Sequence, residues 1–334
     1  PPSPATRWAR SRRPGSPEDR PLGEPGTRHT LDAMPSLTHD ALATLLRLTH
    51  TRRMPHDDEG MRAELSTAQL RPRSFVPPRS LDRHVALRVD ARHGWRVYEM
   101  APWGPTLPQP RVVYLHGGGY VGEIDANHWT VCRRFATLTP ARVVVPIYPV
   151  APDSTAAETV PTAAAIVADV IAEAGDPSLV TVMGDSAGGG MAVAVAQTLR
   201  DNGVGAPRLV LFAPWVDATM SHELVDAVAA RDPMLSVPRL VRAGELYAAD
   251  LRADHPLVSP INGRFDGLGP MTIFVGTRDL LLHDSRRLRD LASGAGVPVD
   301  YHEADGLIHV WPILPLPEAR KARQIIASAL RGTA

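Results

Sequence analysis

The sequence has little of several features that define other classes of protein. It contains one cysteine, Cys132, so no intrachain disulfide can form and no metal site can be built from cysteine pairs. Acidic and basic residues balance at 36 each, so the chain has no excess of positive charge that would attract nucleic acid or an anionic membrane. No run of 18 apolar residues exists, and the early RWARSRR is not followed by an apolar signal core. We expect a cytoplasmic protein without stable membrane insertion or nucleic-acid binding, whose partner is a small, roughly neutral molecule.

The N-terminal region differs in composition from the rest of the chain. Eight of the 33 prolines fall in the first 35 residues, mixed with arginine, glycine and serine, and such a segment buries too little surface to fold alone. We expect residues 1–34 to be a disordered tail, with Met34 a candidate translational start, and residues 35–334 to form the folded domain. The hydrophobic content of 44% is sufficient for a substantial core there.

Short apolar runs, separated by helix-length segments, indicate a sheet. They are VVYL at 112–115, VVVPIY at 143–148, LVTVM at 179–183, LVLF at 209–212, MTIFV at 271–275 and PVDYHEA at 298–304. Strands buried on both faces and joined by helical crossovers are typical of a mainly parallel sheet flanked by helices. VALRVD at 85–90 and WRVYEM at 95–100 predict an antiparallel hairpin before it. The predicted fold class is therefore α/β.

Helical spacing of apolar residues predicts the connecting elements. An alanine-rich helix is expected at 156–174 and another at 187–200, which stops at an Asn-Gly pair. PEARKARQIIASAL predicts a closing helix, and 36–70 predicts two short helices. The interval 214–268 carries helical signals without a convincing strand. We interpret 36–70 and 214–250 as cap elements over one end of the sheet.

The stretch TVMGDSAGGG places Ser186 between a predicted strand and a predicted helix. Gly184 and Gly188 complete the pattern G-x-S-x-G, in which glycines remove side chains that would collide at a tight, strained turn. The serine hydroxyl is then pushed outward at the positive end of a helix. The alternative is a small-residue turn with no chemical role.

A second glycine-rich stretch, HGGGY at 116–120, directly follows the predicted strand VVYL. Consecutive glycines let backbone N–H groups turn toward a developing negative oxygen, where one donor is worth about 3 kcal/mol of transition-state stabilisation. The alternative is a phosphate-binding loop. That alternative lacks the lysine that would neutralise phosphate, because the only lysine of the chain is Lys321.

A serine nucleophile requires a base, and the base requires an orienting acid. His309, in DGLIHVW, follows the last predicted strand and lies at the end of the sheet where Ser186 emerges. Asp279, in VGTRDLLLHD, follows the strand MTIFV and lies on the same edge. The order Ser186, Asp279, His309 is the order of one particular fold.

Other histidines and carboxylates have plainer interpretations. His302 is interpreted as a strand residue, His283 as part of a helix start, and His116 as a structural member of the glycine loop. Asp284 is interpreted as a surface carboxylate or cap of a helix. The side chain of Asp185 is expected to leave the turn in another direction from Ser186.

Six motifs together carry a family resemblance. HGGGY, GDSAGG, YPVAPD at 148–153, HPLVSP at 255–260, VGTRDLLLHDS at 275–285 and GLIHVW resemble the hormone-sensitive-lipase-like branch of the α/β-hydrolases, over roughly residues 85–330. The resemblance implies the α/β-hydrolase fold with a helical cap that lines an acyl pocket. The chain departs from the branch in YPVAPD, where arginine usually follows tyrosine and glutamate ends the motif, and at Glu123, where a small residue is common. These departures concern substrate preference.

The resemblance also implies a role for each candidate residue. Ser186 would be the nucleophile, His309 the general base and Asp279 its partner, in a serine carboxylesterase or acetylhydrolase that forms an acyl-enzyme and uses water. The oxyanion hole would consist of the backbone amides of Gly118, Gly119 and Ala187, and the loop would be supported by His116 and Gly117. No cofactor and no metal is expected.

Several alternatives remain open from the sequence. The same triad could cleave an N-acyl amide, and a non-catalytic receptor built on this fold is a further alternative, although such a receptor would be expected to have lost the base or the nucleophile. Trp215, Met220, Met234 and Trp311 could line the acyl pocket or pack in the core. An edge strand near 298–304 could pair two copies into a homodimer.

Overall fold

The computed structural model describes residues 28–31, 35–49, 76–104, 110–139 and 141–330, together with single positions between 59 and 67. Within these residues, nine strands form one sheet. The strands are β1 (Arg28–Leu31), β2 (Ala86–Arg92), β3 (Trp95–Ala101), β4 (Arg111–Leu115), β5 (Arg142–Ile147), β6 (Val180–Asp185), β7 (Arg208–Phe212), β8 (Met271–Gly276) and β9 (Val299–Ala304).

The sheet is almost entirely parallel. Its order is β1-β9-β8-β7-β6-β4-β5-β3-β2, and only the pairs β2–β3 and β3–β5 are antiparallel, so β3 alone is reversed. Every residue of β6 and β8 is buried, as expected for strands covered on both faces. The predicted parallel sheet and its hairpin are confirmed. The hairpin turns at His93 and Gly94, both at positive φ.

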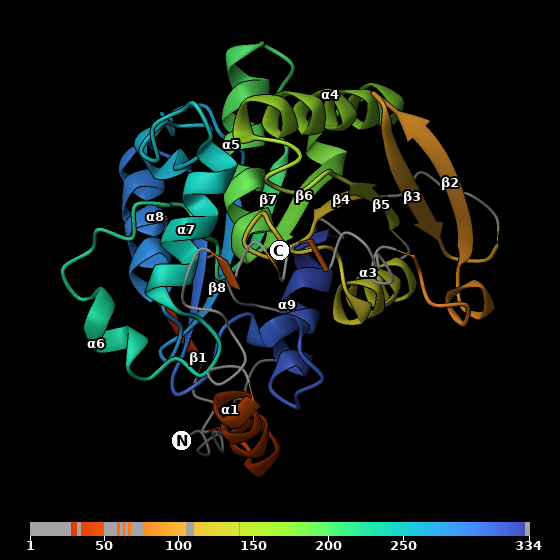
Figure 1. Cartoon of the computed structure of the whole chain (residues 1–334). Helices are drawn as coiled ribbons and strands as arrows, with labels where there is room; N and C mark the ends of the chain where they lie inside the picture. Colours follow the sequence, from red (N-terminus) through yellow and green to blue (C-terminus); the bar gives the residue numbers. More distant parts are fainter. Residues whose placement is uncertain are drawn as a thin grey trace, which may run out of the picture.

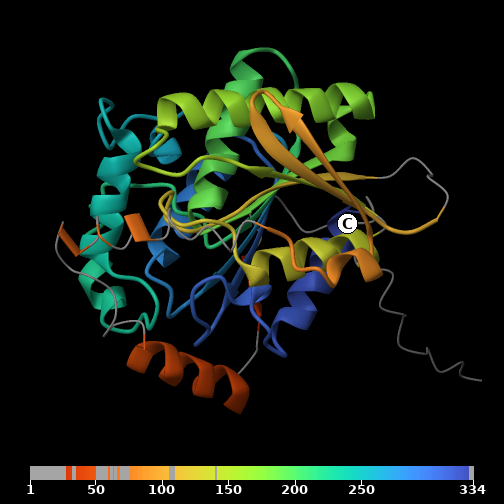
Figure 2. The same ribbon diagram turned by 45° about the vertical axis from the view of Figure 1, so that its right-hand side comes forward.

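Helices cover both faces of the sheet (Figure 1 and Figure 2). One face carries α3 (Ala126–Leu138) and α9 (Ala319–Leu330), and the other carries α4 (Ala156–Ala174), α5 (Ser186–Asp201) and α8 (Leu282–Gly294). Helix α1 (Leu37–Thr49) lies at the bottom of Figure 1, and α6 (Val225–Ala229) and α7 (Val237–Ala248) lie at its left. Short 3₁₀ turns are η1 (Leu81–Arg83), η2 (Pro177–Leu179), η3 (Pro260–Asn262) and η4 (Trp311–Ile313).

Local signals place the helix boundaries. Helix α4 spans the predicted residues 156–174. At its start the Glu158 carboxylate accepts a hydrogen bond from the Thr155 amide at 2.9 Å, and at its end Gly175 adopts φ 77° while its amide bonds back to Ile171. No described residue between β7 and β8 is in a strand, which agrees with the prediction for 214–268. None of the described helices is long and apolar enough to cross a membrane.

Two expectations about the chain ends differ from the structure. Residues 28–31 fall inside the predicted disordered tail but form β1, because their backbone pairs in parallel with Tyr301–Ala304 of β9. The strand at 298–304 is consequently paired on both sides, by β8 and β1, so the expectation that it lies at the edge of the sheet is wrong. A homodimer stays a prediction. Most of the predicted segments 1–34 and 50–70 lies outside the described residues.

Candidate active site

Ser186 lies in the tight turn between β6 and α5. Its φ of 52° is a conformation that side-chain-bearing residues rarely adopt and that is typical of strained functional turns. A Cβ on Gly184 would collide with the backbone of Gly188, and a Cβ on Gly188 would collide with the carbonyl oxygens of Leu115 and His116. The glycines at 184 and 188 are therefore required for this turn to fit against β4, as the motif predicts.

The glycine loop 117–119 follows β4 and faces the same turn. Gly118 and Gly119 have φ of 123° and 62°, and neither amide donates a hydrogen bond to another described residue. Both residues line a pocket together with Ser186. Ala187, in the first turn of α5, has an amide without an intrahelical acceptor. These amides can serve as donors to an oxygen in the pocket.

His116 supports the glycine loop and does not line the pocket. Its Nδ1 lies 2.7 Å from the Gly117 carbonyl oxygen, and the Tyr148 hydroxyl donates to the His116 carbonyl oxygen at 2.6 Å. The two rings stack with centroids 4.2 Å apart. Burial, together with the nearby charge of His128, lowers the pKa of His116 to about 4, so this imidazole is neutral near pH 7.

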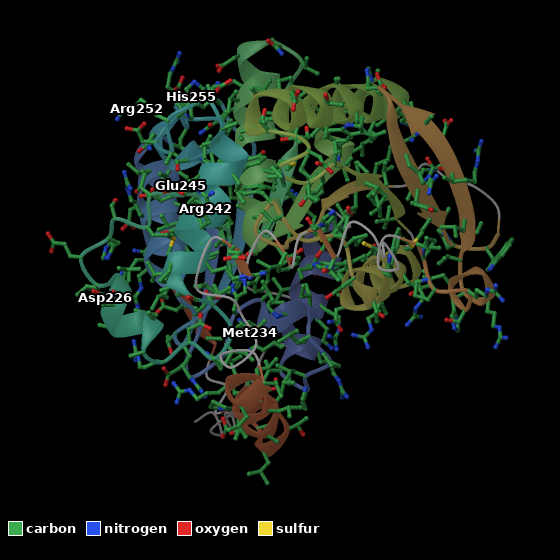
Figure 3. The ribbon with its side chains drawn as sticks, in the orientation of Figure 1. Asp226, Met234, Arg242, Glu245, Arg252 and His255 are labelled. Atoms are coloured by element: carbon green, nitrogen blue, oxygen red, sulfur yellow. The ribbon has the colours of Figure 1, made fainter. Side chains whose placement is uncertain are left out.

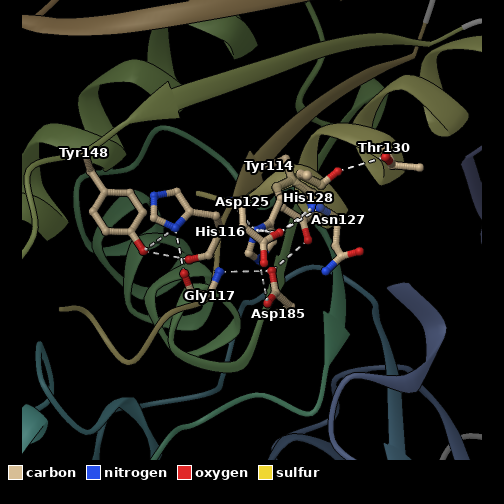
Figure 4. Close-up of polar contacts among 10 residues, drawn as sticks. Tyr114, His116, Gly117, Asp125, Asn127, His128, Thr130, Tyr148 and Asp185 are labelled. Atoms are coloured by element: carbon tan, nitrogen blue, oxygen red, sulfur yellow. Dashed lines mark hydrogen bonds and ion pairs between the residues drawn. The ribbon is translucent and has the colours of Figure 1, made fainter. Parts of the chain in front are cut away.

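Asp185 links the glycine loop to helix α3 (Figure 4). Its Oδ1 accepts the Tyr114 hydroxyl at 2.7 Å and the Gly117 amide at 3.0 Å, and its Oδ2 lies 3.2 Å from Nε2 of His128. Burial would raise the pKa of this carboxyl, but the His128 charge and the hydrogen bonds hold it below its usual value. The side chain ties the loop and the turn to helix α3.

Asp279 and His309 form a buried pair at the ends of neighbouring strands. Nδ1 of His309 lies 3.0 Å from each carboxylate oxygen of Asp279, which also accepts the Leu281 amide at 2.9 Å. Burial alone would lower the pKa of His309, but the Asp279 charge and hydrogen bond, with smaller contributions from Asp232 and Asp185, raise it above its usual value. The arrangement fixes the ring so that Nε2 is the nitrogen available for proton transfer.

Ser186 and His309 open onto one cavity of about 380 Å³. Ser186 Oγ has no hydrogen-bond partner among the described side chains, and such contacts commonly tighten only when substrate binds. Met234, one of the residues with two interpretations, lies in the wall, whereas Trp215, Met220 and Trp311 are buried outside it. The apolar wall residues are Val121, Met234, Leu235, Leu240, Ala243, Val310, Ile313 and Leu314, and the polar ones include Asp125, Asn127 and Arg239.

The remaining candidates lie away from this cavity. His302 stacks on Phe274 at 4.7 Å in the sheet, and His283 stacks on His222 at 4.0 Å. Asp284 is buried, with 8% exposure, and its Oδ2 accepts the amides of residues 216 and 217 at 3.1 Å. Its interpretation as a surface carboxylate or helix cap is therefore wrong, because it ties α8 to the loop after β7.

Comparison with known proteins identifies the family of this chain. A family model described as alpha/beta hydrolase fold matches residues 112–313. The chain belongs to this family. It is 35% identical over 225 residues to an acetyl-hydrolase of Streptomyces hygroscopicus, covering 66% of this chain and 75% of the relative. It is 34% identical to Esterase LipI of Mycobacterium tuberculosis, covering 75% of this chain and 81% of the relative.

Solved structures place this α/β-hydrolase in the hormone-sensitive-lipase-like branch. A hormone-sensitive lipase from a metagenome library superposes with a TM-score of 0.77 at 25% identity, covering 90% of this chain and 99% of that structure. A putative esterase from Staphylococcus aureus gives 0.79 at 25% identity, covering 86% and 97%. This α/β-hydrolase is accordingly a carboxylesterase-type enzyme that hydrolyses esters.

Sequence patterns assign no role to several residues around the site. His128 carries a weak signal, since Asp125 and His128 have the three-residue spacing of a capping box at the start of α3. Asp232 carries none, because a carboxylate in an irregular segment cannot be placed in space by periodicity. The position of Asp185 near the site follows from its place at the end of β6, but its residue type does not indicate which groups its side chain contacts.

Proposed function

We propose that this enzyme hydrolyses small to medium neutral acyl esters, with Ser186 as nucleophile, His309 as general base and Asp279 as the residue that orients the base. The observation that supports this most is the buried His309–Asp279 pair with both oxygens at 3.0 Å, in a cavity shared with the strained Ser186 turn. The cytoplasmic location remains a prediction.

The reaction follows from these positions. Nε2 of His309 takes the proton of Ser186 as Oγ attacks the ester carbonyl carbon, and the carbonyl oxygen becomes an oxyanion that accepts from the amides of Gly118, Gly119 and Ala187. Collapse of the tetrahedral intermediate breaks the bond to the alcohol oxygen, which receives the proton from His309. Water, activated by the same imidazole, then hydrolyses the acyl-enzyme.

The lining of the pocket and its size support neutral substrates of limited length. The cavity of about 380 Å³ has an apolar wall on the side of α7 and a polar side near the start of α3. We propose that α6 and α7 act as cap elements and that the acyl chain lies against the apolar wall. The acetyl-hydrolase named among the relatives supports short acyl chains.

A matched acetate ester and acetamide assayed in parallel separate esterase from amidase activity, and we expect the ester to be the faster substrate.

The nucleophile is tested by Ser186→Ala. We expect ester turnover to fall by several orders of magnitude, because the residual rate then comes only from binding and the oxyanion donors. The measurement is kcat/KM on p-nitrophenyl acetate, with circular dichroism as the control for folding. A folded variant that retains a tenth of the wild-type rate would exclude Ser186 as the nucleophile.

A further inference from the structure

A second buried carboxylate, Asp232, lies beside the Asp279–His309 pair and has no part in the reaction described above. Asp232 is 4% exposed, and its charge interacts with the charges of both Asp279 and His309. Asp232 belongs to the segment between α6 and α7, whereas Asp279 and His309 follow β8 and β9. A residue of the cap segment therefore reaches the proposed acid and base from outside the sheet.

The hydrogen bonds of Asp232 connect two separate parts of the site. Its Oδ1 accepts the amides of Met234 at 2.7 Å and Leu235 at 3.0 Å, and its Oδ2 accepts the Leu280 amide at 2.7 Å. The next amide along the chain, that of residue 281, donates to Asp279. Consecutive amides of one turn thus bind the two carboxylates, so each carboxylate fixes the position of the other.

This bridge joins the pocket wall to the proposed catalytic acid. Met234 and Leu235 both line the cavity that holds Ser186, and Met234 is labelled in Figure 3 on the segment that leads into α7. A shift of the Asp232 carboxylate would move this wall and the turn that carries Asp279 together. Such coupling matters because displacements of about 1 Å in a catalytic group can lower rates about a hundredfold.

The charge of Asp232 also acts on the base. Burial and the Asp279 charge raise the pKa of Asp232 to about 6, and the charges of Asp279, Asp232 and Asp185 all raise the pKa of His309. Of the two arginines adjacent to these carboxylates in sequence, Arg278 has its Nη1 3.7 Å from Oδ1 of Asp40 in α1, and Arg231 is not among the groups that shift the pKa of Asp232.

We propose that Asp232 is a positioning residue of this esterase: it fixes the Met234–Leu235 wall to the turn of Asp279 and adds a second negative charge that favours the imidazolium form of His309. The kinetic consequence rests on the proposed function, in which His309 is the base. The structural and electrostatic consequences do not rest on the proposed function.

The test is Asp232→Asn, which keeps the shape of the side chain and removes its charge. An asparagine amide group offers one acceptor oxygen, so it cannot accept from the amides on both sides at once. Asp284→Asn is the matched control. Asp284 is likewise a buried carboxylate that accepts two backbone amides, and it is not among the groups that raise the pKa of His309.

The first measurement is the pH titration of the His309 imidazole by NMR in ¹⁵N-histidine-labelled protein, assigned with His309→Gln. We expect the pKa of His309 to be lower in Asp232→Asn than in the wild type and unchanged in Asp284→Asn. Equal titration of His309 in the wild type and in Asp232→Asn would overturn the proposal. Should Asp232→Asn not fold, the wild-type signal alone decides: an additional inflection near pH 6 supports the proposal, and a single step overturns it.

The second measurement is the pH dependence of kcat/KM on p-nitrophenyl acetate. In Asp232→Asn the acid limb should move to lower pH, because a less basic imidazole stays neutral further into the acid range, and the plateau should fall about tenfold or more. A purely structural role would lower the plateau without moving the limb. If the NMR shift is found but the wild type hydrolyses no ester, the proposed function fails and the positioning role stands.

Discussion

At the scale of single residues, Gly188 lies very close to neighbouring backbone at the site. A Cβ there would overlap the carbonyl oxygens at the end of β4, where the glycine loop begins. We expect Gly188→Ala to lower the free energy of unfolding by about 1–3 kcal/mol, the cost typical of overpacking, and to reduce kcat as the loop is displaced. Urea denaturation and ester turnover measure both effects.

Gly294 provides the matched control. It also lies in a helix, but a Cβ there has open space within 4 Å and the backbone is not at positive φ. Gly294→Ala should leave turnover unchanged and raise stability by about 0.4–1 kcal/mol, because alanine restricts the unfolded chain. If the two alanine variants behaved alike, the turn between β6 and α5 would not require a glycine at position 188.

The residues proposed to carry out the reaction were largely predictable, and those around them were not. Ser186, Asp279 and His309 each follow a strand of a parallel sheet, so the ends of β6, β8 and β9 bring them to one edge. Asp232 and Asp284 follow no such rule. Their positions depend on how irregular segments pack, and sequence spacing contains no information about contacts between residues 232 and 280 or between residues 284 and 216.

At the scale of elements, α7 presents two different faces. Leu240 points into the cavity with 6% exposure, whereas Glu245 has a side chain 52% exposed and pairs with Arg242 at 2.9 Å on the outer face (Figure 3). Leu240→Ala should lengthen the acyl site. We expect the ratio of kcat/KM for octanoate over acetate esters to rise roughly tenfold, since each additional buried methylene is worth about 0.8 kcal/mol.

The control for this prediction is Glu245→Ala, which removes a side chain of similar length from the solvent side of the same helix. Its octanoate-to-acetate ratio should equal that of the wild type. A ratio that rises equally in both variants would mean that α7 loosens as a whole, and a ratio that stays constant in Leu240→Ala would mean that the acyl chain lies elsewhere.

The elements also show where sequence patterns stop being informative. The bounds of strands β2 to β9 and of α4 agree with the predicted ranges to within one or two residues, because apolar runs and capping residues are local signals. Strand β1 was missed. Its four residues are held by pairing with β9, a contact across some 270 residues that no local pattern encodes.

At the scale of the whole molecule, Asp284 makes stability depend on pH. Burial, with the charge of Asp217, raises the pKa of Asp284 to about 8, against about 3.9 for an unfolded aspartate. Between these values the folded protein holds a proton that the unfolded chain has lost. The contribution of Asp284 to the free energy of unfolding therefore falls as pH rises from about 4 to about 8, and is constant above that range.

Asp284→Asn should remove this loss of stability with rising pH. Both amides of residues 216 and 217 bind one oxygen, Oδ2, so an asparagine can accept both bonds while carrying no charge. At pH 4 the variant and the wild type should unfold at similar urea concentrations, since Asp284 is then protonated in the folded protein and close to half protonated in the unfolded chain. At pH 9 the variant should be more stable by on the order of 1–3 kcal/mol.

Asp254→Asn, at an exposed carboxylate paired with Arg252, should parallel the wild type from pH 5 to pH 9. A variant at residue 284 that is less stable than the wild type at pH 9 would show that the carboxylate is required as an ion to hold α8 against the loop after β7.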